Sequence, residues 1–258
     1  ILNRLSTRKL FFVVDASAYA ASGADKILEP CLHALSVSRF SNFELNPKLH
    51  DIERGVRLMR ETKPDVVVAL GGGSAVVTTR ALIILLAEGG RAQDHATQYP
   101  PGQPPVSPRL MKPKIPNIVV LTTPTTAVTR AGTAVLDLET GHRVELFDPK
   151  TRPAAVFLDT DALLTAPTWL CLSAAASCFS GVVGALQSPE QANPLAEGDL
   201  IQALGLLRRD MQLVKSQEES GRSRVNLCAA AILMNRAMDS GAGGGGLGGV
   251  SSLAHSLD

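Results

Sequence analysis

The sequence predicts an α/β protein, in which a Rossmann-like domain built on a parallel sheet precedes an all-helical domain. Strand-like and helical patterns alternate over residues 8–86, and a turn of three glycines and a serine, residues 71–74, directly follows one strand. Beyond residue 161 the apolar positions recur only at helical spacing. Alternation of this kind builds a parallel sheet flanked by helices, with ligands bound at the carboxyl ends of the strands.

Composition narrows the function classes. The 258 residues suffice for two modest domains, which we expect at 1–161 and 162–258. The formal net charge of +1 argues against a nucleic-acid surface, so a small molecule is the expected partner. The four cysteines lack metal-ligand spacing, which indicates reduced thiols and a cytoplasmic protein. The apolar stretch 81–87 is too short to span a membrane, so we expect a soluble protein.

The expected strands and helices alternate along the first half of the chain. Strands are expected at 8–14, 37–43 and 66–70, and helices at 20–35, 49–59 and after Ser74. Asn46-Pro47 ends the second strand, and Pro64 ends the helix before the third.

The second half begins with a proline-rich segment, 99–116, which we expect to be an irregular surface connector. Strands are then expected at 118–122 and 154–158, with a hairpin between them that joins 135–137 to 144–146. Helices follow at 169–186, 197–215 and 224–238. The glycine tract 241–249 predicts a hinge or a close approach of backbone to a ligand, and the two chain ends suggest a piece of a longer protein.

The glycine turn predicts a phosphate site. Glycines at a strand end let backbone N–H groups approach a phosphate, which the N-terminus of the following helix attracts. Ser74 adds a hydroxyl donor or a helix cap. A tight turn without a ligand would also favour glycine, so the turn alone leaves both interpretations open.

Five segments resemble the iron-containing (group III) alcohol dehydrogenases, which share the dehydroquinate synthase-like architecture. They occur in family order: FELNP (43–47), DVVVALGGGSAVVTTRAL (65–82), VVLTTPTTAVT (119–129), PAAVFLDTDALLTAP (153–167) and LGGVSSLAHSLD (247–258). The resemblance implies NAD(P)-dependent chemistry on alcohols or carbonyl compounds. It also implies a divalent metal, iron or zinc, in the helical domain.

The resemblance assigns cofactor contacts to Asp15, Asn46, Gly71, Gly72, Gly73, Ser74, Thr125, Thr126 and Thr129. Asp15 would bind the adenosine ribose and favour NAD over NADP, although an Asp that only forms a turn is an equally good interpretation. Strand propensity explains Thr122 and Thr123 better than it explains the later threonines. His255 would donate a proton to the nascent alkoxide. The alternative interpretation is that His255 only packs against its neighbours or caps a helix.

The metal ligands of the family are not matched. The family's helical Asp and His align with Ser177 and Gly181, the next His aligns with Ser251, and the last ligand would fall beyond Asp258. Serine and glycine do not hold a divalent ion, so we expect no metal site. A family lysine on the helix after the glycine turn is Arg80 here.

Three hypotheses follow. The favoured one is a metal-independent NAD(P)H-linked dehydrogenase or reductase, for which the related maleylacetate reductases are a precedent. The second is a non-catalytic nucleotide-binding pseudoenzyme. A sugar-phosphate cyclase of the dehydroquinate synthase type would require metal ligands that the sequence lacks. The expected substrate is a small or apolar alcohol or carbonyl compound, neither nucleic acid nor membrane is an expected partner, and a homodimer is left open.

Overall fold

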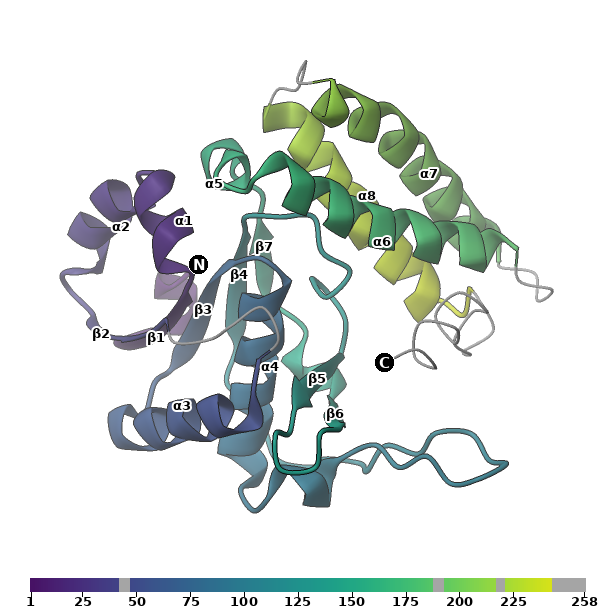
Figure 1. Ribbon diagram of the computed structural model, residues 1–258. Coiled ribbons are helices and arrows are strands. Elements are labelled where there is room, and N and C mark those ends of the chain that lie inside the picture. Colours follow the sequence, from purple (N-terminus) through teal and green to yellow (C-terminus); the bar gives the residue numbers. More distant parts are fainter. Residues whose placement is uncertain (42–46, 188–192, 217–220, 243–258) are drawn as a thin grey trace. The chain divides into compact units, whose positions relative to one another are not determined.

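The computed structural model describes residues 1–41, 47–187, 193–216 and 221–242 (Figure 1). The chain forms two compact units. The first comprises Ile1–Leu121 and Arg130–Phe157, and the second comprises Thr122–Thr129 and the chain from Leu158 onward. The domain boundary near residue 161 stays a prediction, and the sequence did not suggest that a loop from the first half belongs to the second unit.

The first unit is built on a parallel sheet, as the sequence predicts. Its strands are β1 (Lys9–Val14), β2 (Ser36–Phe40), β3 (Val66–Gly71), β4 (Asn117–Leu121) and β7 (Ala155–Phe157). They lie in the order β2-β1-β3-β4-β7, and every neighbouring pair is parallel. The ends of β1 and β3 are therefore adjacent, where Val14 pairs with Leu70.

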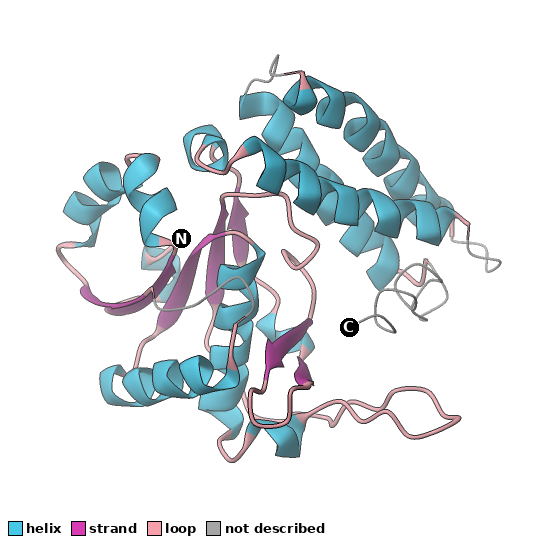
Figure 2. Cartoon of the chain, in the orientation of Figure 1, coloured by secondary structure: helices cyan, strands magenta, loops and turns pink. Residues whose placement is uncertain are grey.

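Helices cover both faces of this sheet (Figure 2). They are α1 (Ala16–Ala21), α2 (Ala24–Leu32), α3 (Leu49–Thr62) and α4 (Gly73–Glu88), with short 3₁₀ turns η1 (Asn3–Leu5), η2 (Ala92–His95) and η3 (Pro149–Thr151). Side chains alternate along β1, so Phe11 and Val13 pack with α3 and α4, whereas Phe12 and Val14 pack with α1 and α2. Apolar residues on both faces explain the unbroken hydrophobic run of this strand.

The predicted single helix at 20–35 is wrong, because the structure contains two short helices there. Asp15 caps α1, and Gly23, with a φ of +70°, separates α1 from α2. A left-handed glycine ends a helix at little steric cost, and the Ser22-Gly23 pair was the overlooked signal. The second strand ends at Phe40, and residue 43 lies outside the described residues.

The predicted hairpin is confirmed as β5 (Gly132–Leu136) and β6 (Arg143–Phe147), in which Val135 pairs with Val144. The proline-rich segment between Tyr99 and Pro116 contains neither helix nor strand, as expected. It is nevertheless firmly attached to the first unit, because Lys114 near its end is buried.

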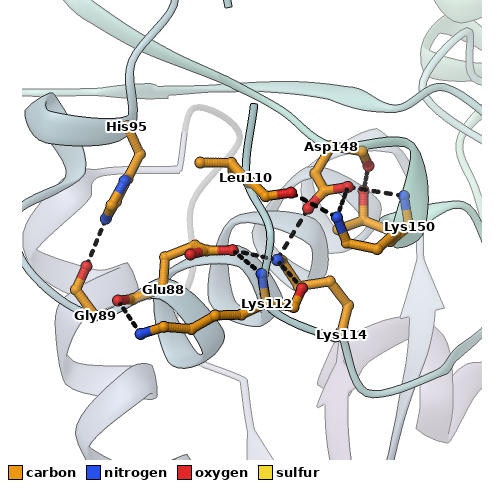
Figure 3. Close-up of polar contacts among 9 residues, drawn as sticks. Glu88, Gly89, His95, Leu110, Lys112, Lys114, Asp148 and Lys150 are labelled. Carbon is orange, nitrogen blue, oxygen red and sulfur yellow. Dashed lines mark hydrogen bonds and ion pairs between the residues drawn. The ribbon is translucent and has the colours of Figure 1, made fainter. Parts of the chain in front are cut away.

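Lys114 links three parts of the first unit (Figure 3). Its Nζ lies 2.6 Å from Oε1 of Glu88 at the end of α4, and 2.9 Å from Oδ2 of Asp148 after β6. Nζ also donates to the Lys112 carbonyl at 2.8 Å. The Lys114 side chain is 0% exposed and those of Glu88 and Asp148 are 9% and 1% exposed, so this is a buried ion-pair network.

Burial disfavours the charged forms of Glu88 and Asp148, but their partners outweigh that effect. The hydrogen bond and charge of Lys114, with the Lys112 amide, hold the pKa of Glu88 below its usual range. Lys114 and the backbone amide of Lys150 do the same for the pKa of Asp148. Both carboxylates therefore stabilise the folded chain as ionised groups.

The described part of the second unit is helical apart from its loops. Its helices are α5 (Thr160–Leu164), α6 (Thr168–Leu186), α7 (Pro194–Lys215) and α8 (Gly221–Asp239). Buried Arg224 of α8 donates from Nη1 to the carbonyls of Leu163 and Ala166, which ties the end of α5 to α8. The all-helical prediction for this region is confirmed.

Helix α6 is the one described helix with the length and mean hydropathy of a membrane span, 19 residues at 1.7. The core helix of a soluble protein has the same properties. Cys171, Ala175, Cys178 and Val182 are buried along one face, and Cys178 Sγ lies 3.9 Å from Met234 Sδ of α8. The expectation that no segment could span a membrane rested on the shorter stretch 81–87 and overlooked α6.

Candidate functional site

The glycine turn lies where the sequence predicts it, at the carboxyl end of β3. Gly71 ends the strand, Gly72 is the N-cap residue of α4, and Gly73 is the first residue of that helix. Gly71 has a φ of +154°, and a Cβ atom there would lie 2.8 Å from the Cβ of Ala75 and 3.4 Å from that of Asp15. Only glycine fits this position without a shift of α4.

The start of α4 is suited to an anion. Its N-cap residue Gly72 has no side chain, so the first-turn amides receive no capping bond from it. The helix dipole adds partial positive charge at the same end, and Ser74 places a hydroxyl in the first turn. The arrangement can hold a phosphate through backbone N–H groups.

Asp15 lies beside this turn, because β1 and β3 are neighbours. Its backbone N–H donates to the Leu70 carbonyl at 2.9 Å. Its Oδ1 accepts from the amides of Ser17 and Ala18 at 3.1 Å, and from the Ser17 hydroxyl at 2.6 Å. The structure therefore gives Asp15 a helix-capping role, and this role leaves its charge at the strand end next to the glycine turn.

A second positive feature of the first unit is Arg80, buried in α4 at 2% exposure. Its Nη1 donates to the Gly132 carbonyl at 2.7 Å and so ties α4 to β5. Burial, followed by the charges of Arg130 and Arg152, lowers the pKa of Arg80 to about 10.

The threonine loop that follows β4 belongs to the second unit. Thr125 Oγ1 accepts from the Ala127 amide at 3.1 Å, which stabilises a tight turn. Asn235 of α8 donates from Nδ2 to the Thr126 carbonyl at 3.0 Å and to Thr129 Oγ1 at 3.1 Å. Asn235 was missed from the sequence, although an amide directly after the apolar run of α8 could have indicated a buried polar contact.

The two described positions that align with metal ligands do not fit a metal ion. Ser177 Oγ donates to the Ser173 carbonyl of its own helix at 3.2 Å. A Cβ at Gly181 would lie 2.7 Å from Met234 Sδ, so a methionine occupies the space that a ligand side chain would need. In the part of the chain that the structure describes, no three His, Cys, Asp or Glu side chains gather to hold a metal.

Three predicted positions, Asn46, Ser251 and His255, lie outside the described residues, as does most of the glycine tract. The remaining cofactor positions fall into two groups. Asp15, the three glycines and Ser74 lie together in the first unit, and Thr125, Thr126 and Thr129 lie together in the second.

Comparison with known proteins decides the family. The model of the family described as iron-containing alcohol dehydrogenase matches residues 1–160, which is more than half of the chain. The chain belongs to the iron-containing alcohol dehydrogenases. The family that the sequence segments predicted is thereby confirmed.

Relatives within this family are distant. Alcohol dehydrogenase 4 of Schizosaccharomyces pombe is 23% identical over 225 residues, which cover 87% of this chain and 50% of that protein. The chain thus spans about half the length of this curated relative.

Solved structures share the fold. A 1,3-propanediol oxidoreductase superposes with a TM-score of 0.80 at 22% identity and covers 92% of this chain and 60% of that one. A sulfoacetaldehyde reductase from Bifidobacterium kashiwanohense, solved with NAD⁺, gives a TM-score of 0.78 at 18% identity and covers 92% and 60%. The predicted fold class, a parallel-sheet α/β unit followed by a mostly helical part, is confirmed.

Proposed function

We propose that the chain is an NAD(P)H-linked oxidoreductase that interconverts a small alcohol and its aldehyde or ketone without a divalent metal ion. The observation that supports it most is the glycine turn. At Gly71 a Cβ would lie 2.8 Å from the Cβ of Ala75, so glycine is needed where β3 turns into α4, the helix whose N-terminus would attract a ligand's diphosphate. Family membership and the NAD⁺ complex of a structural neighbour support a dinucleotide as this ligand.

When bound, NAD(P)H supplies the hydride that reduces the carbonyl carbon. The residues of the chain bind and orient. Backbone amides of Gly73 and Ser74 would hold the diphosphate. The hydroxyl groups of Thr125, Thr126 and Thr129 are assigned to dinucleotide contacts by the family resemblance alone. By the family resemblance, Asn46 joins these contacts and His255 gives the proton to the developing alkoxide.

We infer a preference for NAD over NADP. Asp15 would accept from the ribose hydroxyls and repel a 2′-phosphate. Arg39 of β2 could have offset that repulsion, but both carboxylate oxygens of Glu29 bind its Nη2, at 2.5 and 2.6 Å. An arginine that is already paired is a poor receptor for the phosphate.

Independence from metal is inferred from α6. Ser177 is bonded to its own helix, and Met234 fills the space at Gly181. A Lewis acid contributes several kcal/mol to carbonyl reduction, so donors of the protein must replace it if the chain is active.

The test uses purified protein, NADH or NADPH, and a panel of small aldehydes and ketones, each assayed before and after treatment with a chelator. Turnover that is insensitive to the chelator, and faster with NADH, supports the proposal. Activity that disappears with the chelator and returns with iron or zinc contradicts metal independence.

The second candidate is a pseudoenzyme that binds the dinucleotide and catalyses nothing. The loss of two aligned ligand positions on one helix, Ser177 and Gly181, favours it. In the same assay this candidate predicts tight NADH binding with no turnover of any substrate.

A further inference from the structure

Asn235 cross-links the threonine loop to α8. The side chain is buried, and the residue is 2% exposed. Its amide nitrogen contacts two atoms of the loop: the Thr126 carbonyl at 3.0 Å and Thr129 Oγ1 at 3.1 Å. These residues all belong to the second unit, so the contact does not depend on any other part of the chain.

The orientation of the Asn235 amide follows from its partners. A carbonyl oxygen only accepts hydrogen bonds, so the amide nitrogen has to face Thr126. The same nitrogen then donates to Thr129 Oγ1, which makes the hydroxyl oxygen an acceptor in this contact. A hydroxyl that accepts retains its own proton, and Thr129 is therefore left to donate that proton elsewhere.

Hydrogen bonds within the loop stiffen it as well. Thr125 Oγ1 accepts from the Ala127 amide, and the Val128 amide donates to the Thr125 carbonyl at 3.3 Å. The backbone turn stiffens the stretch 125–129 from within, and the Asn235 contacts attach Thr126 and Thr129 to α8. Donors that are fixed before a ligand arrives cost no reorganisation when they bind it.

We propose that Asn235 is a positioning residue, which holds the 125–129 loop on α8 and orients the Thr129 hydroxyl as a donor to an oxygen of the bound dinucleotide. The proposal rests on the proposed function for the identity of the ligand. The anchoring itself rests only on the contacts of Asn235.

The test compares Asn235→Asp, Thr129→Val and the double variant. A carboxylate is nearly isosteric with the amide but cannot donate, so Asn235→Asp loses the bond to the Thr126 carbonyl and reverses the bond to Thr129, whose hydroxyl then donates to the carboxylate instead of to the ligand. Each single variant should weaken NADH binding by about tenfold, as expected for the loss of one hydrogen bond to a ligand. The double variant should bind no more weakly than Asn235→Asp, because both changes remove the same donor.

Asn226→Asp is the matched control. Asn226 lies on the same helix and donates from Nδ2 to Asp210 Oδ1 at 3.2 Å, away from the loop. This variant introduces the same charge into α8, next to the buried Asp210 carboxylate, so it should destabilise the helix at least as much and still leave NADH affinity unchanged. Equal weakening in both aspartate variants would mean a general loss of helix stability and would overturn the proposal.

Hydrogen exchange of the loop provides a readout that needs no ligand. In Asn235→Asp, amide exchange at Ala127 and Val128 should quicken relative to Asn226→Asp, while exchange in β1 stays the same. Unchanged loop exchange overturns the proposal, and so do additive effects of the two single substitutions on NADH affinity. If wild-type protein takes up no NADH, the proposed function and the donor role fail together, and the exchange data still decide on the anchoring.

Discussion

Gly71→Ala is the substitution that most directly perturbs the glycine turn. The added Cβ would lie 2.8 Å from the Cβ of Ala75, well inside ordinary carbon contact, and the φ of +154° is one that alanine rarely adopts. Strain of this kind costs about 1–3 kcal/mol, and relieving it requires the first turn of α4 to move. A phosphate that loses one charge-assisted amide bond loses about 1.5–3 kcal/mol, so the dissociation constant for NADH should rise by at least about tenfold.

The assay is a fluorescence titration with NADH, accompanied by urea unfolding to establish that the variant is folded. Gly141→Ala is the control, because Gly141 has a φ of +72° but no atom within 4 Å of its Cβ position. It shares the backbone strain and lacks the collision, so its NADH affinity should equal that of the wild type. A folded Gly71→Ala protein with wild-type affinity would refute the role of the turn.

The remaining predictions concern the buried network, α6 and cofactor choice. Lys114→Met should lower the free energy of unfolding by about 3 kcal/mol, because it removes the buried cation that Glu88 and Asp148 share and leaves them mainly backbone amides and Lys150 as partners, whereas Lys112→Met should cost about 1 kcal/mol or less in urea titrations. The pKa values of the Glu88 and Asp148 carboxyls are lowered in the folded protein, so these groups contribute their full stabilisation to folding above the ordinary pKa values of 4.5 and 3.8. This contribution should be lost as the pH falls below those values, and the loss should be smaller in Lys114→Met. Gly184→Ala, with open space around its Cβ, should stabilise the protein by up to about 1 kcal/mol in thermal unfolding, whereas Gly181→Ala in the same helix should gain less, because its Cβ has to displace the thioether end of Met234. Asp15→Asn keeps a good helix cap and removes the charge, so the ratio of NADH to NADPH affinity should fall by about tenfold in parallel titrations; an unchanged ratio would assign Asp15 to capping alone.

Much of the first unit was predictable because its signals are local. The apolar runs of β1, β3 and β4 can only be strands covered on both faces, and the glycines after β3 are required by backbone geometry at Gly71. The error at 20–35 had a local cause as well, since Gly23 interrupts a pattern whose apolar spacing continues through it.

The contacts of the candidate site were less predictable because their partners are remote in sequence. Asn235 meets Thr129 across 106 positions, and Lys114 meets Asp148 only because α4, the proline-rich segment and the β6 end converge. Composition and periodicity reveal that a polar residue interrupts an apolar pattern, but they do not identify its partner. The sequence showed that Gly181 stands where the family has a metal ligand. It did not show that the Met234 side chain fills the space beside Gly181.

The occupancy of the glycine turn is tested most directly by calorimetric titration of NADH into chelator-treated wild-type protein. We predict saturable uptake of one dinucleotide per chain, with affinity unaffected by added iron or zinc. Absence of binding heat for both NADH and NADPH, or uptake that appears only after a metal ion is restored, would contradict the account.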